Sequence, residues 1–245
     1  MKHSCGNFLL LQTMENIRHI FFDLDNTLWD YRRNAKITLA KLYEEFQIEE
    51  IHGYTFKEFY PFYYESNEQL WADFRDQKLT KEELRNRRFP EAFQNLGIPN
   101  PDFALEFETR FVSEVTGSNY VVEGTGEILE YLKNKYELHI LSNGFEGVTH
   151  QKINGCLIKN YIKTVTTAEG AGAPKPSGIA FQTALDKANA KKEESVYIGD
   201  DWIADMGGAT KFGMRAIFFN PLNESHFWQE EIPVIDNLIE LKNYL

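Results

Sequence analysis

Five short apolar runs, rich in β-branched and aromatic residues, constrain the fold of this chain most strongly. They are His19–Phe22, Glu137–Leu141, Thr164–Thr167, Ser195–Ile198 and Arg215–Phe219. Uninterrupted apolar runs of this length are typical of strands that are buried on both faces of a parallel sheet. The last four runs alternate with amphipathic stretches. We therefore expect an α/β fold with a Rossmann-like, doubly wound parallel sheet and helices on both faces.

Two of the amphipathic stretches predict helices with a clear apolar face. Residues 126–135 place Ile128, Leu129 and Leu132 on one side of a helix. Residues 177–190 follow Pro174-Lys175-Pro176, and Ser177 has the side chain expected of a helix N-cap. These helices fit between the predicted strands.

The strand pattern stops between about Tyr31 and Tyr120, where helical patterns carry many charges and aromatic residues. Breakers at residues 52–53, 97–101 and 116–119 divide this stretch into about four helices. We therefore expect an all-helical domain at residues 31–119, inserted into an α/β core made of residues 14–30 and 120–245. Residues 1–13 are interpreted as an N-terminal extension. Either Met14 is the true start or these residues form a genuine tail.

The composition excludes several classes of function. The net charge is −11, and no Lys/Arg run occurs beyond Arg85, Arg87 and Arg88, so polymeric nucleic acid is not an expected partner. Cys5 and Cys156 lack the spacing of a disulfide framework or a zinc site, which favours a reducing, cytoplasmic location. The sequence has no run of about 18 apolar residues that could span a membrane, so no membrane partner is expected.

Two carboxylates follow directly after the first predicted strand. Asp23 and Asp25 stand two positions apart, so an extended backbone would direct both toward the same ligand. Ligands of open α/β sheets bind at this carboxyl edge. A lone Asp here would more often form a helix N-cap or an Asx-turn. The pair favours a nucleophile and an acid/base that share one site.

Polar residues also follow the next three strands. The second strand ends at Ser142-Asn143-Gly144, where a hydroxyl and turn amides could hold a phosphoryl oxygen. The third leads to Lys175, which stands between two prolines. The fourth ends at Gly199-Asp200-Asp201, with Asp205 shortly after. So many carboxylates repel one another unless a cation lies among them, and Mg²⁺ prefers oxygen ligands.

Taken in order, these residues resemble the motifs of the haloacid dehalogenase (HAD) superfamily. Those motifs are Asp-x-Asp-x-Thr, Ser/Thr, Lys, and Gly-Asp followed by another Asp. They correspond here to Asp23/Asp25/Thr27, Ser142, Lys175 and Gly199/Asp200/Asp205. The resemblance extends from about Ile17 over nearly the whole chain. It implies that the inserted helical domain is a cap, which closes over the site and excludes water.

The resemblance also implies a role for each matching residue. Asp23 would attack phosphorus, and Asp25 would protonate the leaving oxygen and later activate water. Ser142, Asn143 and Lys175 would hold the phosphoryl group. The metal ligands for Mg²⁺ would be Asp23, the backbone carbonyl of Asp25, Asp200 and Asp205, with Asp201 near the ion. Because the dehalogenases of the superfamily lack the second Asp of the first motif, Asp25 disfavours dehalogenation.

A closer resemblance is to bacterial pyrimidine 5′-nucleotidases and house-cleaning nucleotide phosphatases. It is carried by residues 67–71 and 78–89 and by Ser142-Asn143-Gly144-Phe145. Two stretches depart from the usual pattern: Glu123-Gly124 stands where Pro-Gly is common, and Gly170-Ala171-Gly172-Ala173 is a divergent approach to Lys175. The second departure lies in the loop that leads to Lys175, so the resemblance defines this loop less closely than the other motifs.

We therefore expect a Mg²⁺-dependent phosphomonoester hydrolase that acts on nucleoside 5′-monophosphates through an aspartyl phosphate. The alternatives are a sugar-phosphate phosphatase, a phosphosugar mutase of the same fold, and a non-catalytic phosphometabolite-binding protein. The expected partner is a small phosphorylated metabolite, and the expected assembly is a monomer or homodimer.

Aromatic residues between positions 54 and 74 suit a flat leaving group such as a nucleobase. Most of them have the spacing of a helical core, so Trp29 and Tyr31, near the predicted hinge, are the better candidates for substrate contact. Arg75 and Arg88 are interpreted as exposed helical arginines. The six histidines form no i, i+4 ligand pair and are interpreted as structural or surface residues.

Overall fold

The computed structural model describes residues 14, 16–99, 101–223 and 232–245. The chain divides into two compact units. We call Met1–Asp30 with Tyr120–Leu245 the sheet unit, and Tyr31–Asn119 the helical unit. The proposed extension at residues 1–13 lies outside the described residues.

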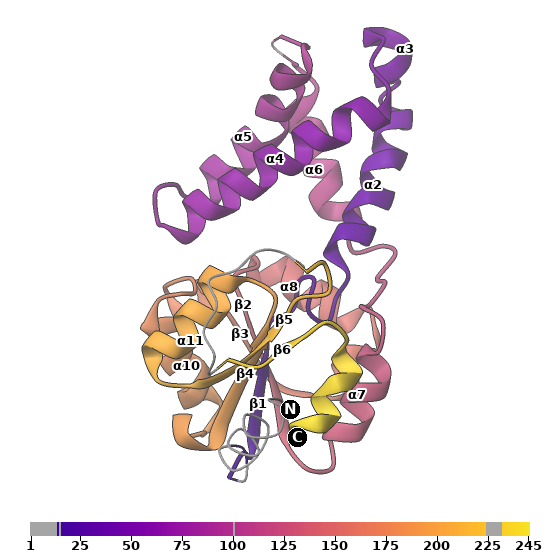
Figure 1. The fold of residues 1–245 in the computed structure, drawn as a ribbon. Coiled ribbons are helices and arrows are strands. Elements are labelled where there is room, and N and C mark those ends of the chain that lie inside the picture. The colour runs from indigo at the N-terminus through magenta and orange to yellow at the C-terminus, as the bar shows by residue number, and fades with distance from the viewer. Residues whose placement is uncertain (1–13, 15, 100, 224–231) are drawn as a thin grey trace, which may run out of the picture. The chain divides into compact units, whose positions relative to one another are not determined.

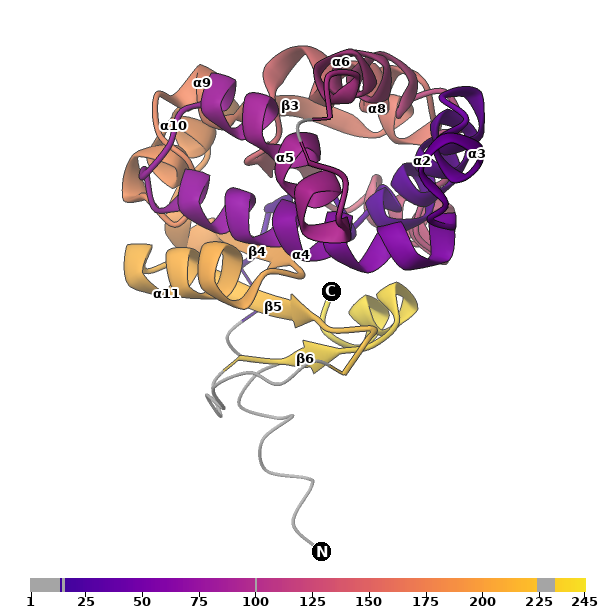
Figure 2. The ribbon, with the colours of Figure 1, turned by 90° about the horizontal axis from the view of Figure 1, so that it is seen from above.

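A six-stranded sheet in the order β3-β2-β1-β4-β5-β6 forms the centre of the sheet unit. Every neighbouring pair of strands is parallel (Figure 1), which confirms the predicted α/β class. The strands are β1 (His19–Phe22), β2 (Glu137–Ser142), β3 (Ile162–Thr167), β4 (Ser195–Gly199), β5 (Arg215–Phe219) and β6 (Val234–Ile235). The five predicted strands agree with the structure to within two residues at each end. The two-residue β6 (Figure 2) is too short to give a sequence pattern.

Helices and helical turns connect the strands of the sheet unit. The helices are α7 (Thr125–Leu132), α8 (Glu146–Asn154), α9 (Ala168–Ala171), α10 (Gly178–Ala188) and α11 (Gly208–Phe212). The shorter helical segments are η1 (Leu157–Asn160), η2 (Lys192–Glu194), η3 (Trp202–Gly207) and η4 (Leu238–Asn243). As predicted, the Ser177 side chain caps α10 by accepting a hydrogen bond from the backbone N–H of Ile179. On one face of the sheet, Phe21 and Tyr197 pack with Phe181 of α10 in a buried apolar cluster.

Helices are the only regular secondary structure among the described residues of the helical unit, as expected. They are α2 (Tyr31–Glu45), α3 (Ile48–His52), α4 (Phe56–Arg75), α5 (Lys81–Leu96) and α6 (Ala104–Glu114). The longest pair, α4 and α5, lie side by side (Figure 2). Each of these two helices starts with a capping box, formed by Thr55 with Glu58 and by Thr80 with Glu83. The predicted number of helices was one short of the five described here, because α3 is a single short segment after α2.

Aromatic side chains fill the interior of the helical unit. The fully buried ones are Phe59, Tyr63, Phe89, Phe93, Phe107 and Phe111. Phe59 stacks on Phe93 and Tyr63 stacks on Phe89, so α4 and α5 are joined by ring contacts. Offset aromatic pairs of this kind add about 0.5–1.5 kcal/mol each beyond the area they bury. Much of the aromatic density of the sequence therefore serves the core of this unit.

A buried ion pair lies within the same core. The Arg88 guanidinium donates to both carboxylate oxygens of Glu108 at 2.8 Å, and it also donates to Asn67 Oδ1. The prediction that Arg88 is an exposed surface arginine is wrong, since only 3% of the residue is exposed. Its helical spacing places it on the apolar face of α5, where Glu108 of α6 supplies the counter-charge. In the described part of the chain, no helix has both the length and the apolar character of a membrane span.

Replacing Arg88 with Met should destabilise the protein by about 3 kcal/mol or more, because Glu108 would remain buried after losing its main partner. Chemical denaturation in urea measures this change. Arg87→Met is the matched control, since Arg87 is half-exposed and pairs with Glu91 at the surface; it should shift stability by less than about 0.5 kcal/mol. Equal effects of the two substitutions would contradict the assignment.

Candidate active site

Four loops that follow strands β1 to β4 bring polar side chains to one edge of the sheet. Asp23 comes directly after β1, Asn143 after β2, and Asp200 after β4. Lys175 lies in the segment between α9 and α10, after β3. Because the strands are parallel and adjacent (Figure 1), their carboxyl ends meet at the same edge, which is where open α/β sheets bind ligands.

The Lys175 ammonium joins three of these loops. Its Nζ donates to Asp23 Oδ1 at 2.5 Å, to Asp205 Oδ1 at 2.7 Å and to the Tyr197 hydroxyl at 2.7 Å. Lys175 is 2% exposed, so these three oxygens are its immediate surroundings. A buried ammonium is tolerated only with such partners.

Asn143 fixes the backbone that carries this lysine. Its side-chain Oδ1 accepts from the Lys175 backbone N–H at 2.7 Å, and its Nδ2 donates to the Lys175 carbonyl at 3.0 Å. The two bonds tie the loop after β2 to the loop that contains Lys175. The side chain of Asn143 thus fixes the position of the Lys175 backbone.

Three carboxylates lie around the ammonium. One oxygen atom from each of Asp23, Asp200 and Asp205 can be chosen so that all lie within 4.8 Å of one another. Thr27 orients Asp200 by donating to its Oδ1 at 3.0 Å, and the Asp201 backbone N–H donates to Asp205 Oδ2 at 3.0 Å. A Cβ atom on Gly199 would lie 2.2 Å from Asp205 Oδ2, which explains why a glycine precedes the acidic segment.

Asp201 caps a helical segment, unlike its acidic neighbours Asp200 and Asp205. Its Oδ1 accepts from the backbone N–H groups of Ile203 and Ala204, both at 2.8 Å, and so caps η3. The η3 segment is a single π-helical turn, a form that is frequent at functional sites. It carries Asp205 into the buried interior.

The electrostatics of this group favour the binding of a cation. Burial is the largest cause that raises the pKa of Asp23, and with the neighbouring carboxylates it brings this pKa to about 7 against the opposing effect of Lys175. Burial also opposes the charge on Lys175, but Asp205 and Asp23 outweigh it and raise the pKa of the lysine. When all three carboxylates are ionised, the one ammonium leaves two negative charges unbalanced. A divalent cation with a preference for oxygen ligands, such as Mg²⁺, fits this set of donors.

Asp25 is not part of this group of three carboxylates, and its side chain pairs with a different cation. The buried Lys152 of α8 donates to Asp25 Oδ1 at 2.5 Å. The same ammonium lies 4.6 Å from the centre of the Trp29 ring, a cation–π contact. Lys152 therefore holds the Asp25 side chain from α8, the helix that follows β2.

Gly144 brings the loop after β2 close to Asp25. A Cβ at Gly144 would be 2.7 Å from Thr149 Oγ1 and 3.5 Å from Asp25 Oδ2. The backbone N–H of Gly144 donates to Ser142 Oγ at 3.0 Å, and Ser142 is buried. Ser142, Gly144 and Asp25 thus form a compact neighbourhood of polar atoms beside the acidic group.

The structure therefore gathers the residues predicted from the sequence in two neighbouring groups. Asp23, Lys175, Asp200 and Asp205 form the first, and Asp25 with Ser142 lies in the second. Sequence reasoning missed Tyr197, whose hydroxyl is the third partner of Lys175, and Lys152. The expected substrate contact through Trp29 is wrong for this structure, because Trp29 is fully buried beneath Lys152.

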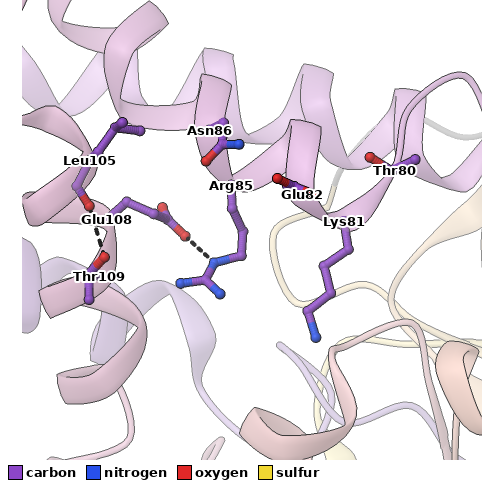
Figure 3. Close-up of a pocket in the computed structure, with 8 residues that line it drawn as sticks. All are labelled: Thr80, Lys81, Glu82, Arg85, Asn86, Leu105, Glu108 and Thr109. Carbon is purple, nitrogen blue, oxygen red and sulfur yellow. Dashed lines mark hydrogen bonds and ion pairs between the residues drawn. The ribbon is translucent and has the colours of Figure 1, made fainter.

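The helical unit has a cavity of its own. Its volume is about 510 Å³. The residues that line it are shown in Figure 3: Thr80, Lys81, Glu82, Arg85, Asn86, Leu105, Glu108 and Thr109. Arg85 crosses it to reach Glu108, with Nε 3.1 Å from Oε1. None of these residues belongs to the two groups described above.

Residues 20–219 match the family described as haloacid dehalogenase-like hydrolase. The chain belongs to this family. Two relatives resemble it over most of their length. The chain is 26% identical to the pyrimidine 5′-nucleotidase PynA of Streptococcus pneumoniae, over 83% of this chain and 84% of the relative. It is 29% identical to the ribulose-1,5-bisphosphate 5-phosphatase of Halopiger xanaduensis, over 84% of this chain and 86% of the relative.

The fold agrees with solved structures of HAD hydrolases. The HAD-hydrolase YfnB from Bacillus subtilis, solved with bound magnesium, superposes with a TM-score of 0.82 at 23% identity. The match covers 93% of this chain and 97% of YfnB. At this identity the likeness shows the fold alone.

Binding of Mg²⁺ to this HAD hydrolase should release protons at about pH 6, because metal ligands must be deprotonated. Asp23 is largely protonated below a pKa of about 7 in the metal-free protein. Affinity for Mg²⁺ should therefore rise with pH up to about 7 and then level off. Calorimetric titration in two buffers with different ionisation enthalpies counts the released protons. If Asp23→Asn releases as many protons as the wild type, the protons come from another group.

Proposed function

We propose that this HAD hydrolase is a Mg²⁺-dependent phosphomonoesterase that forms a covalent phosphate ester on Asp23. The observation that carries the proposal is the buried Asp23 carboxylate, which Lys175 holds within a group of three carboxylates. A binding protein would have no need of a nucleophile with an acid/base beside it. The names of two relatives, a pyrimidine 5′-nucleotidase and a ribulose-1,5-bisphosphate 5-phosphatase, support the same proposal.

The proposed reaction has two steps. In the first, an Asp23 oxygen attacks phosphorus, the bond to the leaving oxygen breaks, and Asp25 gives that oxygen its proton. In the second, water attacks the phosphorus of the aspartyl phosphate, Asp25 takes a proton from the water, and the bond to Asp23 breaks. Inorganic phosphate leaves, and both carboxylates return to their initial states.

The surrounding residues make each step possible. We assign Asp23, Asp200, Asp205 and the backbone carbonyl of Asp25 as the groups that would hold Mg²⁺. The ion would supply positive charge between the Asp23 carboxylate and the phosphate, which otherwise repel each other. Lys175 neutralises part of the same charge.

Phosphate binding is assigned to Lys175 and to the loop after β2. Ser142 contributes its hydroxyl. Since the Asn143 side chain is occupied with the Lys175 backbone, Asn143 would act through its own backbone N–H. Lys152 positions Asp25, because its ammonium contacts that carboxylate directly. Oriented donors of this kind are what stabilises a phosphoryl group in transfer.

We propose nucleoside 5′-monophosphates as the substrates, because the nucleotidase PynA is among the relatives. Aromatic contacts support this choice less strongly than the sequence suggested. Phe59 and Tyr63 are buried in the helical unit. The aromatic residues of α4 that stay half-buried or exposed are Phe56, Tyr60, Phe62, Tyr64, Trp71 and Phe74. A sugar phosphate is the second candidate, since the phosphatase of Halopiger xanaduensis is named for one.

Asp23→Asn should abolish phosphate release while the fold persists, because an amide is neither an adequate nucleophile nor an anionic ligand. Asp25→Asn should slow turnover by roughly 10²–10⁴-fold, the contribution of a general acid/base. Release of inorganic phosphate with Mg²⁺, and with excess chelator, measures both effects. Asp186→Asn, on the exposed side of α10, is the control and should keep full activity. Substantial turnover by folded Asp23→Asn would refute the mechanism.

The substrate assignment predicts higher kcat/KM for UMP and dUMP than for glucose 6-phosphate or phosphoglycolate. Stacking of about 1–3 kcal/mol per base corresponds to roughly five- to 150-fold preference. One panel under a single condition, with AMP and ribulose 1,5-bisphosphate included, decides between the candidates. If the sugar phosphates are hydrolysed as well as every nucleotide, the nucleotidase assignment fails and the phosphatase assignment stands.

A further inference from the structure

A second group of potential metal ligands lies on the sheet, near the start of β1 and β2. It consists of His19, Glu137 and His139, and one ligand atom from each can be chosen so that all lie within 4.8 Å of one another. His19 and Glu137 are the first residues of their strands, whereas Asp23 and Ser142 lie at the other ends. The group is therefore separate from the candidate active site, and its argument is independent of the proposed function.

The strand register accounts for this grouping. His19 is paired with Glu137, and Phe21 with His139. Since side chains two positions apart in a strand share a face, all three ligands project from the same face of the sheet. The two histidines are 120 residues apart in the sequence and become neighbours only because β1 and β2 pair.

The distance between the rings suits a shared metal ion. His19 Nδ1 lies 3.2 Å from His139 Nε2. Two imidazole nitrogens bound to one tetrahedral zinc ion are about 3.3 Å apart, given Zn–N distances of 2.0–2.1 Å. Glu137 is exposed beside this buried pair and would close a set of two imidazoles and one carboxylate. A water molecule could then take the fourth position.

A second contact orients the inner ring. His139 Nδ1 lies 2.8 Å from Thr164 Oγ1 of β3, and the His139 ring stacks on Phe21. With the Nδ1–H donating to the Thr164 hydroxyl, Nε2 carries a lone pair that faces His19. Metal-binding histidines are commonly held through their other ring nitrogen in this way.

We propose that His19, His139 and Glu137 bind a divalent transition-metal ion of the zinc type, with Thr164 as the positioning residue of His139. The ion would join the starts of β1 and β2. It would take the place of the proton that a direct hydrogen bond between the two imidazoles requires. Imidazole ligands favour zinc, cobalt, nickel or copper and give Mg²⁺ no advantage, so this site and the carboxylate group would select different ions.

Titration of the full-length protein with Co²⁺ in excess Mg²⁺ tests the proposal, because Mg²⁺ competes for carboxylate ligands and not for imidazoles, and cobalt reports its own coordination through visible absorption. We expect one equivalent of Co²⁺ to bind and Zn²⁺ to displace it. Thr164→Val, which keeps the shape of the side chain, should weaken binding by about 10- to 100-fold. Glu137→Gln should weaken it as well, whereas Glu106→Gln, an exposed position on α6, should leave it unchanged.

Three results would overturn the proposal. The first is that no cobalt binds. The second is that the wild type, Glu137→Gln and Thr164→Val bind cobalt with equal affinity. The third is that Mg²⁺ displaces the cobalt completely. The last result would assign the ion to the carboxylate group. Circular dichroism of each metal-free variant establishes that it is folded. Phosphatase activity is not needed as a readout, so failure here and failure of the proposed function are distinguishable.

Discussion

The contact between the Lys175 ammonium and its three oxygen partners holds the candidate active site together. Lys175, Asp23 and Asp205 come from three loops that are far apart in the sequence, and each would be costly to bury alone. The tyrosine that completes the arrangement, Tyr197, also donates to the Leu141 carbonyl at 2.9 Å. The loops after β1, β3 and β4 are thereby tied to one charge, and Tyr197 connects the arrangement to β2. Because the carboxylates still outnumber the ammonium, the arrangement is left with the negative charge that a divalent ion would neutralise.

The sheet could be predicted because its strands are buried on both faces. Such strands appear as apolar runs, and the polar residues directly after them mark the carboxyl edge of the sheet. The boundary between α4 and α5 was harder to see, since Asp76–Leu79 contains neither glycine nor proline. Its signal was the Thr80 and Glu83 capping box, which was present in the sequence. The two-residue β6 depends on pairing with β5 and leaves no periodic pattern to detect.

The site was predictable where its residues follow strands and hidden where they lie within an element. Tyr197 occupies an inward position of β4, so its sequence context is that of a core aromatic. Lys152 belongs to a helix with other polar residues, and only the fold brings it to Asp25. Arg88 shows the converse: its helical context suggested a solvated side chain, but α6 places Glu108 against it. In each case the deciding partner is distant in the sequence, and local pattern carries no information about it.

The pairing of His19 and His139 also depends on residues that are distant in the sequence. Ligand pairs on a helix are visible in a sequence because they recur at i, i+4, and the absence of that spacing led us to interpret the histidines as structural. On paired strands no fixed spacing exists, since the register sets which residues meet. The sheet thus presents oxygen ligands after the carboxyl ends of its strands and imidazoles near the starts of β1 and β2. These two donor sets differ in the ions they prefer. Under the two proposals, Mg²⁺ at the carboxylates and a zinc-type ion at the imidazoles would bind without competition between the two sites.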